Sequence, residues 1–306
     1  MGLVLAIGSL ALWATPAQAD EPLFGFVYTT DLLPKGAKEV EQWMTWRRKK
    51  SRGSFDVWEG RTEFSYGLTD RLQVSLYANY AKTKTNLNNV DGTTAPPESF
   101  AEVQADPNSP LNASKYVGTS LEFIYRIWSP YTDPFGFALY IEPTIGRGLR
   151  ELESKLVFQK NFLDDRLVFA GNITVAQEMR YLPGDPTAAS DSEDALSHWD
   201  RETDVNFNIE ASYRFARNWS AGLEFLNERE YSSFSLRPQN RTNSAYYFGP
   251  TIHYGGKQFF FTATFLEQLR GARDYANPPP GFIVDGRTYA DDFERYRLRV
   301  KAGFFF

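Results

Sequence analysis

The last eleven residues of the chain restrict its fold more than any other stretch. Apolar and basic side chains alternate there, with Tyr296, Leu298, Val300, Ala302, Phe304 and Phe306 at one parity and Arg297, Arg299 and Lys301 at the other. A period of two residues is that of an extended strand, whose successive side chains point to opposite faces. The pattern therefore predicts that the chain ends in a β-strand with one apolar face and one charged face.

Composition narrows the class of protein that can contain such a strand. Aromatic residues make up 16% of the 306 residues, yet no apolar run beyond residue 20 approaches the ~20 residues that a membrane-spanning helix needs. Many aromatic residues without long apolar runs are typical of a transmembrane barrel, whose strands show lipid to one face only. The chain has no cysteine, so disulfides cannot hold it together, and a net charge of -5 gives no basis for binding nucleic acid.

The N-terminus has the pattern of an export signal. Residues 2–13 are almost wholly apolar, and Ala17-Gln18-Ala19 supplies a cleavage site of small residues. We predict a signal peptide over residues 1–19, although the usual Lys or Arg is missing from its start, and a periplasmic N-terminal segment over residues 20–37. The alternative is a membrane anchor, but the apolar run is short and Pro16 follows it.

From residue 38 onward, strand-like runs alternate with connections that are short on one side and mostly long and polar on the other. Turn-forming residues fill the short connections, as in Gly67-Leu-Thr-Asp70, whereas residues 83–115, 182–203, 231–244 and 270–291 form the long ones. We predict an all-β fold over residues 38–306, a transmembrane antiparallel up-and-down β-barrel of about twelve strands with both termini in the periplasm. The runs are Lys38–Lys50, Phe55–Tyr66, Arg71–Lys82, Tyr116–Trp128, Phe135–Arg147, Glu151–Asn161, Arg166–Tyr181, Asp204–Phe215, Trp219–Glu230, Ala245–Tyr254, Gln258–Leu269 and Asp292–Phe306.

One parity of these runs is apolar and carries aromatic residues near both ends. In the second run, Trp58 and Tyr66 lie on this face, and at ~3.3 Å per residue and a tilt of ~40° their heights differ by about 20 Å. Two aromatic girdles at that separation fit the borders of a bilayer. A soluble β-sandwich, the alternative, would expose the same aromatic surface to water.

The opposite parity is crowded with charge and is expected to line the lumen. Its candidates are Glu39, Glu41, Arg47, Glu59, Arg61, Glu63, Glu122, Arg126, Glu142, Glu153, Lys155, Glu210, Arg214, Glu224, Arg297, Arg299 and Lys301. Barrel closure places the last strand beside the first. We therefore expect the basic row of the last strand to meet Glu39 and Glu41 and, one strand further, Glu59 and Glu63.

Two interpretations of these charges stay open. The charges can form a salt-bridge network that locks the seam, or an acidic wall and a basic wall of a polar conduit. Twelve strands give a backbone radius of about 12 Å, and inward side chains would leave about 5 Å or less. A barrel of this size can hold a narrow channel for small polar solutes, or it can be closed by inward Glu and Arg side chains or by the N-terminal segment tucked into its mouth.

Catalysis would need a nucleophile beside a histidine. The chain has two histidines: His253, at a strand end, and His198, in the loop Ser197-His198-Trp199-Asp200. An outer-membrane hydrolase that acts on lipids or peptides is therefore a third possibility, after a channel and a structural barrel. The acidic loop around residues 185–204 matches no regular calcium-binding spacing, and we expect neither a metal nor a cofactor.

Three stretches carry a resemblance to a known group of proteins: Phe26–Gly36, Val40–Trp43 and the Tyr66–Arg71 turn. With the aromatic C-terminus, they resemble a functionally uncharacterised family of bacterial outer-membrane β-barrel proteins. The resemblance implies insertion by the barrel-assembly machinery, with Tyr296, Phe304 and Phe306 as the assembly signal. It also implies a place among outer-membrane lipids and lipopolysaccharide, but it transfers no activity.

From the residues themselves, we predict passive passage of small polar solutes through a charged lumen. A closed barrel that serves as a structural or assembly partner of an envelope complex is the alternative.

Overall fold

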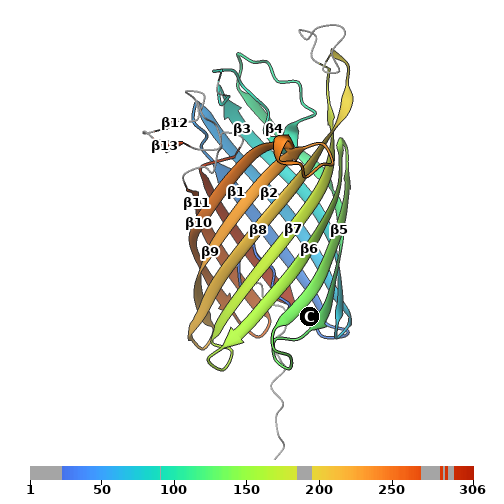
Figure 1. Cartoon of the computed structure of the whole chain (residues 1–306), viewed down its shortest axis with the longest axis vertical. Coiled ribbons are helices and arrows are strands. Elements are labelled where there is room, and N and C mark those ends of the chain that lie inside the picture. Colours follow the sequence, from blue (N-terminus) through green and yellow to red (C-terminus); the bar gives the residue numbers. More distant parts are fainter. Residues whose placement is uncertain (1–22, 90, 185–194, 270–282, 285–286, 289–292) are drawn as a thin grey trace, which may run out of the picture.

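The computed structural model describes residues 23–89, 91–184, 195–269, 283–284, 287–288 and 293–306. Within this part of the chain, twelve antiparallel strands close into a barrel in which each strand pairs with its neighbours along the sequence and β14 pairs with β1 (Figure 1). The predicted fold class is therefore confirmed. The expected signal peptide over residues 1–19 lies outside the described residues.

The barrel strands follow the predicted runs closely. They are β1 (Lys38–Arg48), β2 (Ser54–Thr69), β3 (Leu72–Asn86), β4 (Leu111–Trp128), β5 (Gly136–Gly146), β6 (Leu149–Phe162), β7 (Leu167–Leu182), β8 (His198–Ala216), β9 (Trp219–Ser232), β10 (Arg241–Gly255), β11 (Phe259–Gln268) and β14 (Tyr296–Phe305). Two short 3-10 turns, η1 (Glu98–Phe100) and η3 (Pro238–Asn240), and a two-stranded hairpin of β12 (Ile283–Val284) and β13 (Arg287–Thr288) lie in the long connections. No helix in the described ranges is long and apolar enough to cross a membrane.

Three strands begin four or more residues earlier than their sequence pattern indicates. β4 starts at Leu111 rather than Tyr116, β8 at His198 rather than Asp204, and β10 at Arg241 rather than Ala245. The β7–β8 ladder continues without interruption to the pair Leu182↔His198. These extensions lie beyond the apolar belt, where neither face of the strand must be apolar, so the alternation that marks a strand is lost there.

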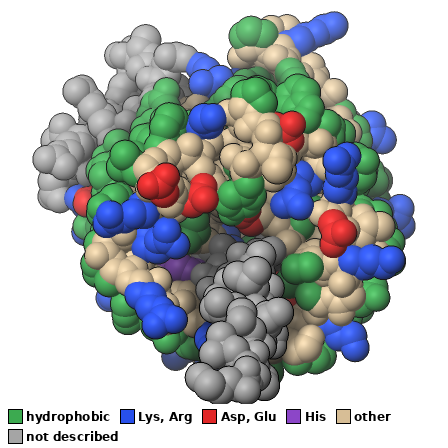
Figure 2. Space-filling view, turned by 90° about the horizontal axis from the view of Figure 1, so that it is seen from below, with side chains coloured by type: hydrophobic (Ala, Val, Ile, Leu, Met, Phe, Trp, Pro, Cys, Tyr) green, Lys and Arg blue, Asp and Glu red, His purple; other side chains and the backbone are tan. Residues whose placement is uncertain are grey.

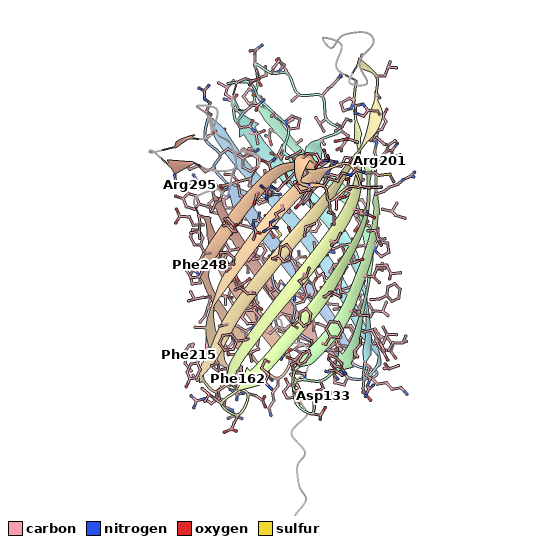
Figure 3. The ribbon with its side chains drawn as sticks, viewed as in Figure 1. Asp133, Phe162, Arg201, Phe215, Phe248 and Arg295 are labelled. Carbon is pink, nitrogen blue, oxygen red and sulfur yellow. The ribbon has the colours of Figure 1, made fainter. Side chains whose placement is uncertain are left out.

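The outward face of the barrel is an apolar belt. Phe64, Leu76 and Ile209 expose 43%, 51% and 62% of their surface, fractions that are unfavourable in water and favourable against lipid. In Figure 3, Phe162 and Phe215 lie near the end with the short turns and Phe248 lies midway along the barrel. We call the two ends the short-turn end and the long-loop end. Figure 2 views the short-turn end, where Lys and Arg side chains are spread around the rim.

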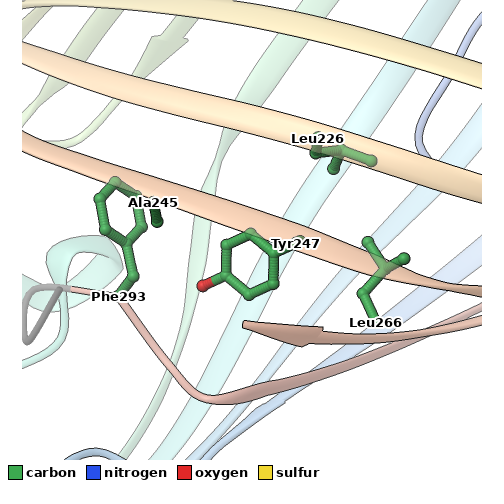
Figure 4. Packing of buried hydrophobic residues seen from close by; sticks show 5 residues of the cluster. All are labelled: Leu226, Ala245, Tyr247, Leu266 and Phe293. Carbon is green, nitrogen blue, oxygen red and sulfur yellow. The ribbon is translucent and has the colours of Figure 1, made fainter. Parts of the chain in front are cut away.

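The interior holds small apolar clusters between its polar side chains. One cluster joins Leu226, Ala245, Tyr247 and Leu266 of the wall to Phe293, which precedes β14 (Figure 4). Two others contain residues that precede β1: Leu32 packs with wall residues of β4, β5 and β6, and Phe24 and Val27 pack with β7. The described stretch that precedes β1 therefore lies inside the barrel, from Phe24 to Leu32.

Candidate functional site

The lumen is occupied by residues 23–33, which we call the inner segment. Its first contact is bidentate, because the backbone N–H groups of Gly25 and Phe26 donate to the two carboxylate oxygens of Glu224 at 2.8 and 2.9 Å. Glu224 belongs to β9 and is fully buried. A carboxylate that accepts two backbone hydrogen bonds forms charge-assisted contacts, which are stronger than neutral ones.

Three neutral side chains of the wall hold the rest of the inner segment. Asn172 of β7 accepts from Tyr28 N at 2.7 Å and donates to Tyr28 O at 3.0 Å. Gln159 of β6 accepts from Thr30 N at 2.7 Å, and Gln73 of β3 accepts from Leu33 N at 2.8 Å. The backbone N–H and C=O groups of a closed barrel already form hydrogen bonds with one another between its strands. A segment inside the barrel must therefore find its hydrogen-bond partners among the side chains of the wall.

The inner segment fills the half of the lumen nearer the short turns. Gln73 stands at the start of β3 and Gln159 near the end of β6, both beside short connections. Asp31 accepts a hydrogen bond at 2.9 Å from Tyr131, which lies in the short connection between β4 and β5. Leu23, at the start of the inner segment, lines a cavity at the same end. The inner segment therefore starts and ends near the short-turn end and closes the lumen there.

Tyr28 is the central side chain of this closure. Its ring lies 5.1 Å from that of Tyr140 and 6.3 Å from that of Trp43, and the ammonium of Lys155 lies 4.6 Å from its centroid. Its hydroxyl donates to Glu122 at 3.3 Å. Aromatic edges and cation–π contacts add specific geometry to apolar packing, which fixes the segment in one position.

The charges around Tyr28 are partnered inside the wall. Arg61 pairs with Glu142 and lies 3.9 Å above the ring of Tyr77, whose hydroxyl donates to Glu122 at 2.6 Å. Lys301 lies 3.7 Å above the ring of Trp43. Buried charges that found no partner would cost several kcal/mol each, so these contacts stabilise the filled interior.

Toward the long-loop end, the lumen opens into a charged cavity of about 320 Å³, which we call the vestibule. It is lined by Thr45, Arg47, Glu59, Glu98, Glu153, Glu178, Arg180, Asp204, Asn206, Glu228, Arg229, Glu230, Phe293, Arg297 and Arg299. A second cavity of about 220 Å³ adjoins it and shares four lining residues, Glu59, Glu98, Glu153 and Arg180.

Buried ion pairs shape one side of the vestibule. Arg297 of β14 pairs with Glu228 of β9 at 2.6 Å and with Glu294, and Arg47 of β1 pairs with Glu294 at 2.8 Å and with Glu59 at 3.2 Å. Burial alone would disfavour the charged form of Glu294, but its two arginine partners hold its pKa at about 2.

The long connection between β3 and β4 reaches into the mouth of the vestibule at the long-loop end. Glu98 of η1 pairs with Arg180 at 2.6 Å, and Phe100 of the same turn is buried. The positive charge of Arg180 lowers the pKa of Glu98. The loop between β3 and β4 therefore covers part of the opening and divides the two cavities.

Carboxylates gather on the β7–β8 wall, on the far side from β1. Oxygens of Glu98, Glu178 and Glu202 lie within 4.8 Å of one another, and so do those of Glu202, Asp204 and Glu230. Arg180 also pairs with Glu178. β7 lies six strands from β1 around the ring of twelve, so the acidic wall stands opposite the arginines of β1 and β14.

The charged residues predicted from the sequence face inward but divide among three places. One group surrounds the inner segment and comprises Arg61, Glu63, Glu122, Glu142, Lys301 and the buried Glu39 and Glu41. A second group lines the vestibule and comprises Glu59, Arg297 and Arg299. Arg126 donates to Thr30 O at 3.3 Å, Arg214 lines a cavity of about 170 Å³ at the short-turn end, and Glu210 is buried on β8 next to Glu224. The aromatic residues Tyr296 and Phe304 lie on β14, which closes the barrel against β1, and Phe306 follows directly.

The register changes the expected seam contacts in part. Lys301 does reach the acidic residues, because it lines a cavity of about 30 Å³ together with Glu39, Glu41 and Glu63, but no basic residue of β14 stands directly opposite Glu39 or Glu41. β14 does lie beside β1, but Lys301 stands opposite Trp43, Arg299 opposite Thr45 and Arg297 opposite Arg47. Glu41 faces Gly303 instead of a basic residue. The odd or even position of a residue in its strand determines which face its side chain occupies. The register of β14 against β1 depends instead on the stagger of the whole barrel, which cannot be read from the alternation within one strand.

Sequence reasoning missed several residues of the site. Asn172, Gln159 and Gln73 are uncharged, so a pattern of inward charges does not include them, although their parity in the predicted runs places them in the lumen. Glu178 and Arg180 share the inward parity of Asn172 in the predicted run 166–181. Glu98 and Glu294 lie outside periodic segments, so no local signal marks them.

The histidines take positions that differ from those of a catalytic pair. His253 is buried on β10, with Nδ1 2.8 Å from Thr262 Oγ1. His198 begins β8 instead of lying in a loop, and its Nδ1 lies 3.0 Å from the carbonyl oxygen of Leu196. These Nδ1 contacts thus join His253 to a hydroxyl and His198 to a backbone carbonyl.

Comparison with known proteins yields a family and a fold. Residues 16–306 match a family of unknown function (DUF6662). No curated protein matches the chain. Among solved structures, the COG4313 outer-membrane channel from Pseudomonas putida F1 is similar with a TM-score of 0.53 at 9% identity, over 90% of this chain and 98% of that one. The β domain of the Bordetella autotransporter BrkA has a TM-score of 0.50 at 10% identity, over 89% and 100%. At such identities the likeness concerns the fold alone.

Proposed function

This chain belongs to a family of unknown function (DUF6662), and we propose from its own geometry that it is a narrow outer-membrane channel for small polar solutes, gated by its N-terminal segment. The proposal rests on how the lumen is closed. A separate stretch of chain, held by hydrogen bonds to wall side chains, fills the short-turn half of the lumen. Such a closure can be released without breaking the barrel.

The outer surface and the ends of the barrel support an outer-membrane location. An apolar belt, aromatic residues near its borders and short turns at one end are features of outer-membrane barrels. The short-turn end then faces the periplasm, and the vestibule faces the outside. The C-terminal aromatic residues would serve the barrel-assembly machinery during insertion.

The charge of the vestibule supports a preference for cations and amines. Its lining contains seven carboxylate side chains and five arginines. The arginines Arg47 and Arg297 are engaged in ion pairs on one side, whereas carboxylates cluster on the opposite wall. A low-dielectric opening with an acidic wall raises the local concentration of positive solutes.

A closed structural barrel is the second candidate, and the packing around Tyr28 favours it. Trp43, Tyr77 and Tyr140 form an aromatic interior, with Arg61, Lys155 and Lys301 over their rings. If the inner segment never leaves this site, the protein acts through its surface, as a partner of another envelope component.

Conductance across a planar bilayer separates the two candidates. The wild-type protein is compared with a variant that lacks residues 20–33, under a salt gradient that reports ion preference. A gated channel predicts rare openings for the wild type and steady, cation-preferring conductance for the deletion. A correctly folded deletion variant that stays silent at all voltages would refute the channel and leave the structural barrel.

A further inference from the structure

A groove of about 780 Å³ runs along the outside of the barrel at the long-loop ends of β1 to β4, in the upper part of Figure 1. Its lining comprises Met44, Asp56, Trp58, Tyr80, Ala81, Lys82, Thr83, Lys84, Ser114, Lys115 and Tyr116. It is separate from the vestibule, because the two cavities have no lining residue in common.

Register arranges the outward residues of the groove in rows across the strands. The row nearest the membrane is Met44↔Gly60↔Tyr80↔Tyr116, the next is Trp46↔Trp58↔Lys82↔Ser114, and the third is Arg48↔Asp56↔Lys84↔Asn112. Side chains thus change from apolar and aromatic to basic along the barrel axis. This order matches the order of acyl chains and headgroups in a leaflet.

A glycine creates the floor of the groove. The ring of Tyr80 lies flat across β2 at Gly60, where an added Cβ would stand 2.1 Å from Tyr80 Cε2. The Tyr80 hydroxyl reaches β1, where Gln42 Nε2 donates to it at 2.5 Å. Tyr80 therefore covers two strands instead of projecting outward, and this leaves a recess between Trp58 and Tyr116.

The basic side chains of the groove point to an anionic partner. Lys82 and Lys84 are exposed, and neither ammonium has an ion-pair partner among the described residues. Asp56, the carboxylate in the groove, accepts a hydrogen bond from Trp46 Nε1 at 2.7 Å. Arg48 lies 5.1 Å from the ring of Trp46 at the same height as Lys84.

We propose that this groove binds a phosphorylated glycolipid of the outer leaflet, that is, one molecule of lipopolysaccharide through its lipid A. One acyl chain lies on the floor formed by Tyr80 and Gly60, against Trp58 and Tyr116. A lipid A phosphate accepts hydrogen bonds from Lys82 and Lys84 at the membrane surface. Lysines act as point charges toward phosphate, which suits a headgroup that approaches from the side.

Charge argues against a second copy of this chain as the occupant. A two-fold contact over the groove would bring Lys82 and Lys84 of both copies together, which is repulsive. A lipid also fits the direction of the groove, because the change from apolar to basic residues runs along the barrel axis.

Native mass spectrometry of the detergent-solubilised protein tests the site. The probes are bisphosphorylated lipid A, the same lipid A without phosphate, and phosphatidylglycerol as another anionic lipid. We expect Lys82→Gln with Lys84→Gln to weaken lipid A binding about 30-fold, since each basic residue near an anionic membrane surface contributes about a factor of five to binding. The matched control is Arg147→Gln with Arg150→Gln, which removes two exposed basic charges from the same rim at β5 and β6. It should change binding less than twofold.

A second variant tests the recess without changing charge. Ser114→Trp fills the groove from an exposed, outward-facing position and should also abolish tight lipid A binding. Leu121→Trp, on the outward face of the same strand but outside the groove, should not. The proposal is overturned if the lysine pair and the arginine pair weaken binding equally, if dephosphorylated lipid A or phosphatidylglycerol binds as tightly as lipid A, or if Ser114→Trp binds normally.

Discussion

Asn172→Leu should open the channel, because this one side chain satisfies both backbone polar groups of Tyr28. Leucine has a similar volume and makes neither hydrogen bond. A buried backbone group that loses its partner costs about 1–3 kcal/mol, so two such groups destabilise the docked segment by at least about 2 kcal/mol. At about 1.4 kcal/mol per factor of ten, the ratio of docked to released segment falls at least about 30-fold.

Asn208→Leu is the matched control for this change. Asn208 stands directly opposite Asn172 in the β7–β8 ladder, is also buried in the lumen, and makes no hydrogen bond to residues 23–37. The same substitution there leaves the inner segment satisfied. Macroscopic conductance in planar bilayers measures the difference, with electrophoretic heat-modifiability as the check that each barrel is folded.

Equal conductance of the two leucine variants would refute the reasoning. It would mean either that other contacts hold the segment regardless of Tyr28, or that the segment does not control the pore. Protease cleavage within residues 23–33 distinguishes these outcomes, because a released segment is cleaved whether or not ions pass.

Three further predictions concern the same closure and the vestibule. Thr30→Cys with Gly136→Cys should form a disulfide that locks the pore until reductant is added, and the chain has no other cysteine. A Cβ at Gly136 would lie 3.2 Å from Thr30 Cβ and 2.9 Å from Pro130 Cδ, so the two backbones must separate by a few tenths of an ångström to reach the Cβ–Cβ distance of a disulfide, about 3.5–4.5 Å. Current that ignores reductant would contradict this prediction. Burial raises the pKa of Asp31, despite hydrogen bonds from Gln159 and Tyr131 and the nearby Arg126, so the docked segment binds a proton more tightly than the released one. Docking should then be strongest at low pH and weaken as pH rises through the pKa of docked Asp31, and Asp31→Asn should remove this pH dependence of conductance. Asp204→Asn with Glu202→Gln should lower the cation preference of the open deletion variant, measured as a smaller reversal potential, while Asp164→Asn with Asp165→Asn in a short turn should not.

The barrel could be predicted from the sequence because each strand carries its own evidence. Alternation in β14, β2 and β3 reports directly which face meets lipid, and the contrast of short and long connections gives the direction of each strand. The inward direction of the charges follows from the same parity. These are local properties, and the strand count and the lumen-facing set needed nothing else.

The closure of the lumen could not be predicted in the same way. Residues 23–33 have no two-residue period, and their partners Glu224, Asn172, Gln159 and Gln73 come from four different strands. The register of β14 against β1 likewise depends on the stagger around all twelve strands. Both are properties of the finished ring rather than of any one stretch.

The hydrogen bonds of the inner segment also determine when it can dock. Gly25 and Glu224 are 199 residues apart in the chain, Tyr28 and Asn172 are 144 apart, and Gly25 and Arg299 are 274 apart. Contacts of such separation form late in folding, and these partners surround a common axis only after β14 has joined β1. The inner segment therefore reaches its place after the ring has closed, and we expect each newly inserted copy to pass through a stage in which residues 23–33 do not yet fill the lumen. For a channel closed by this segment, the speed of that final step would set how long each insertion leaves the membrane leaky.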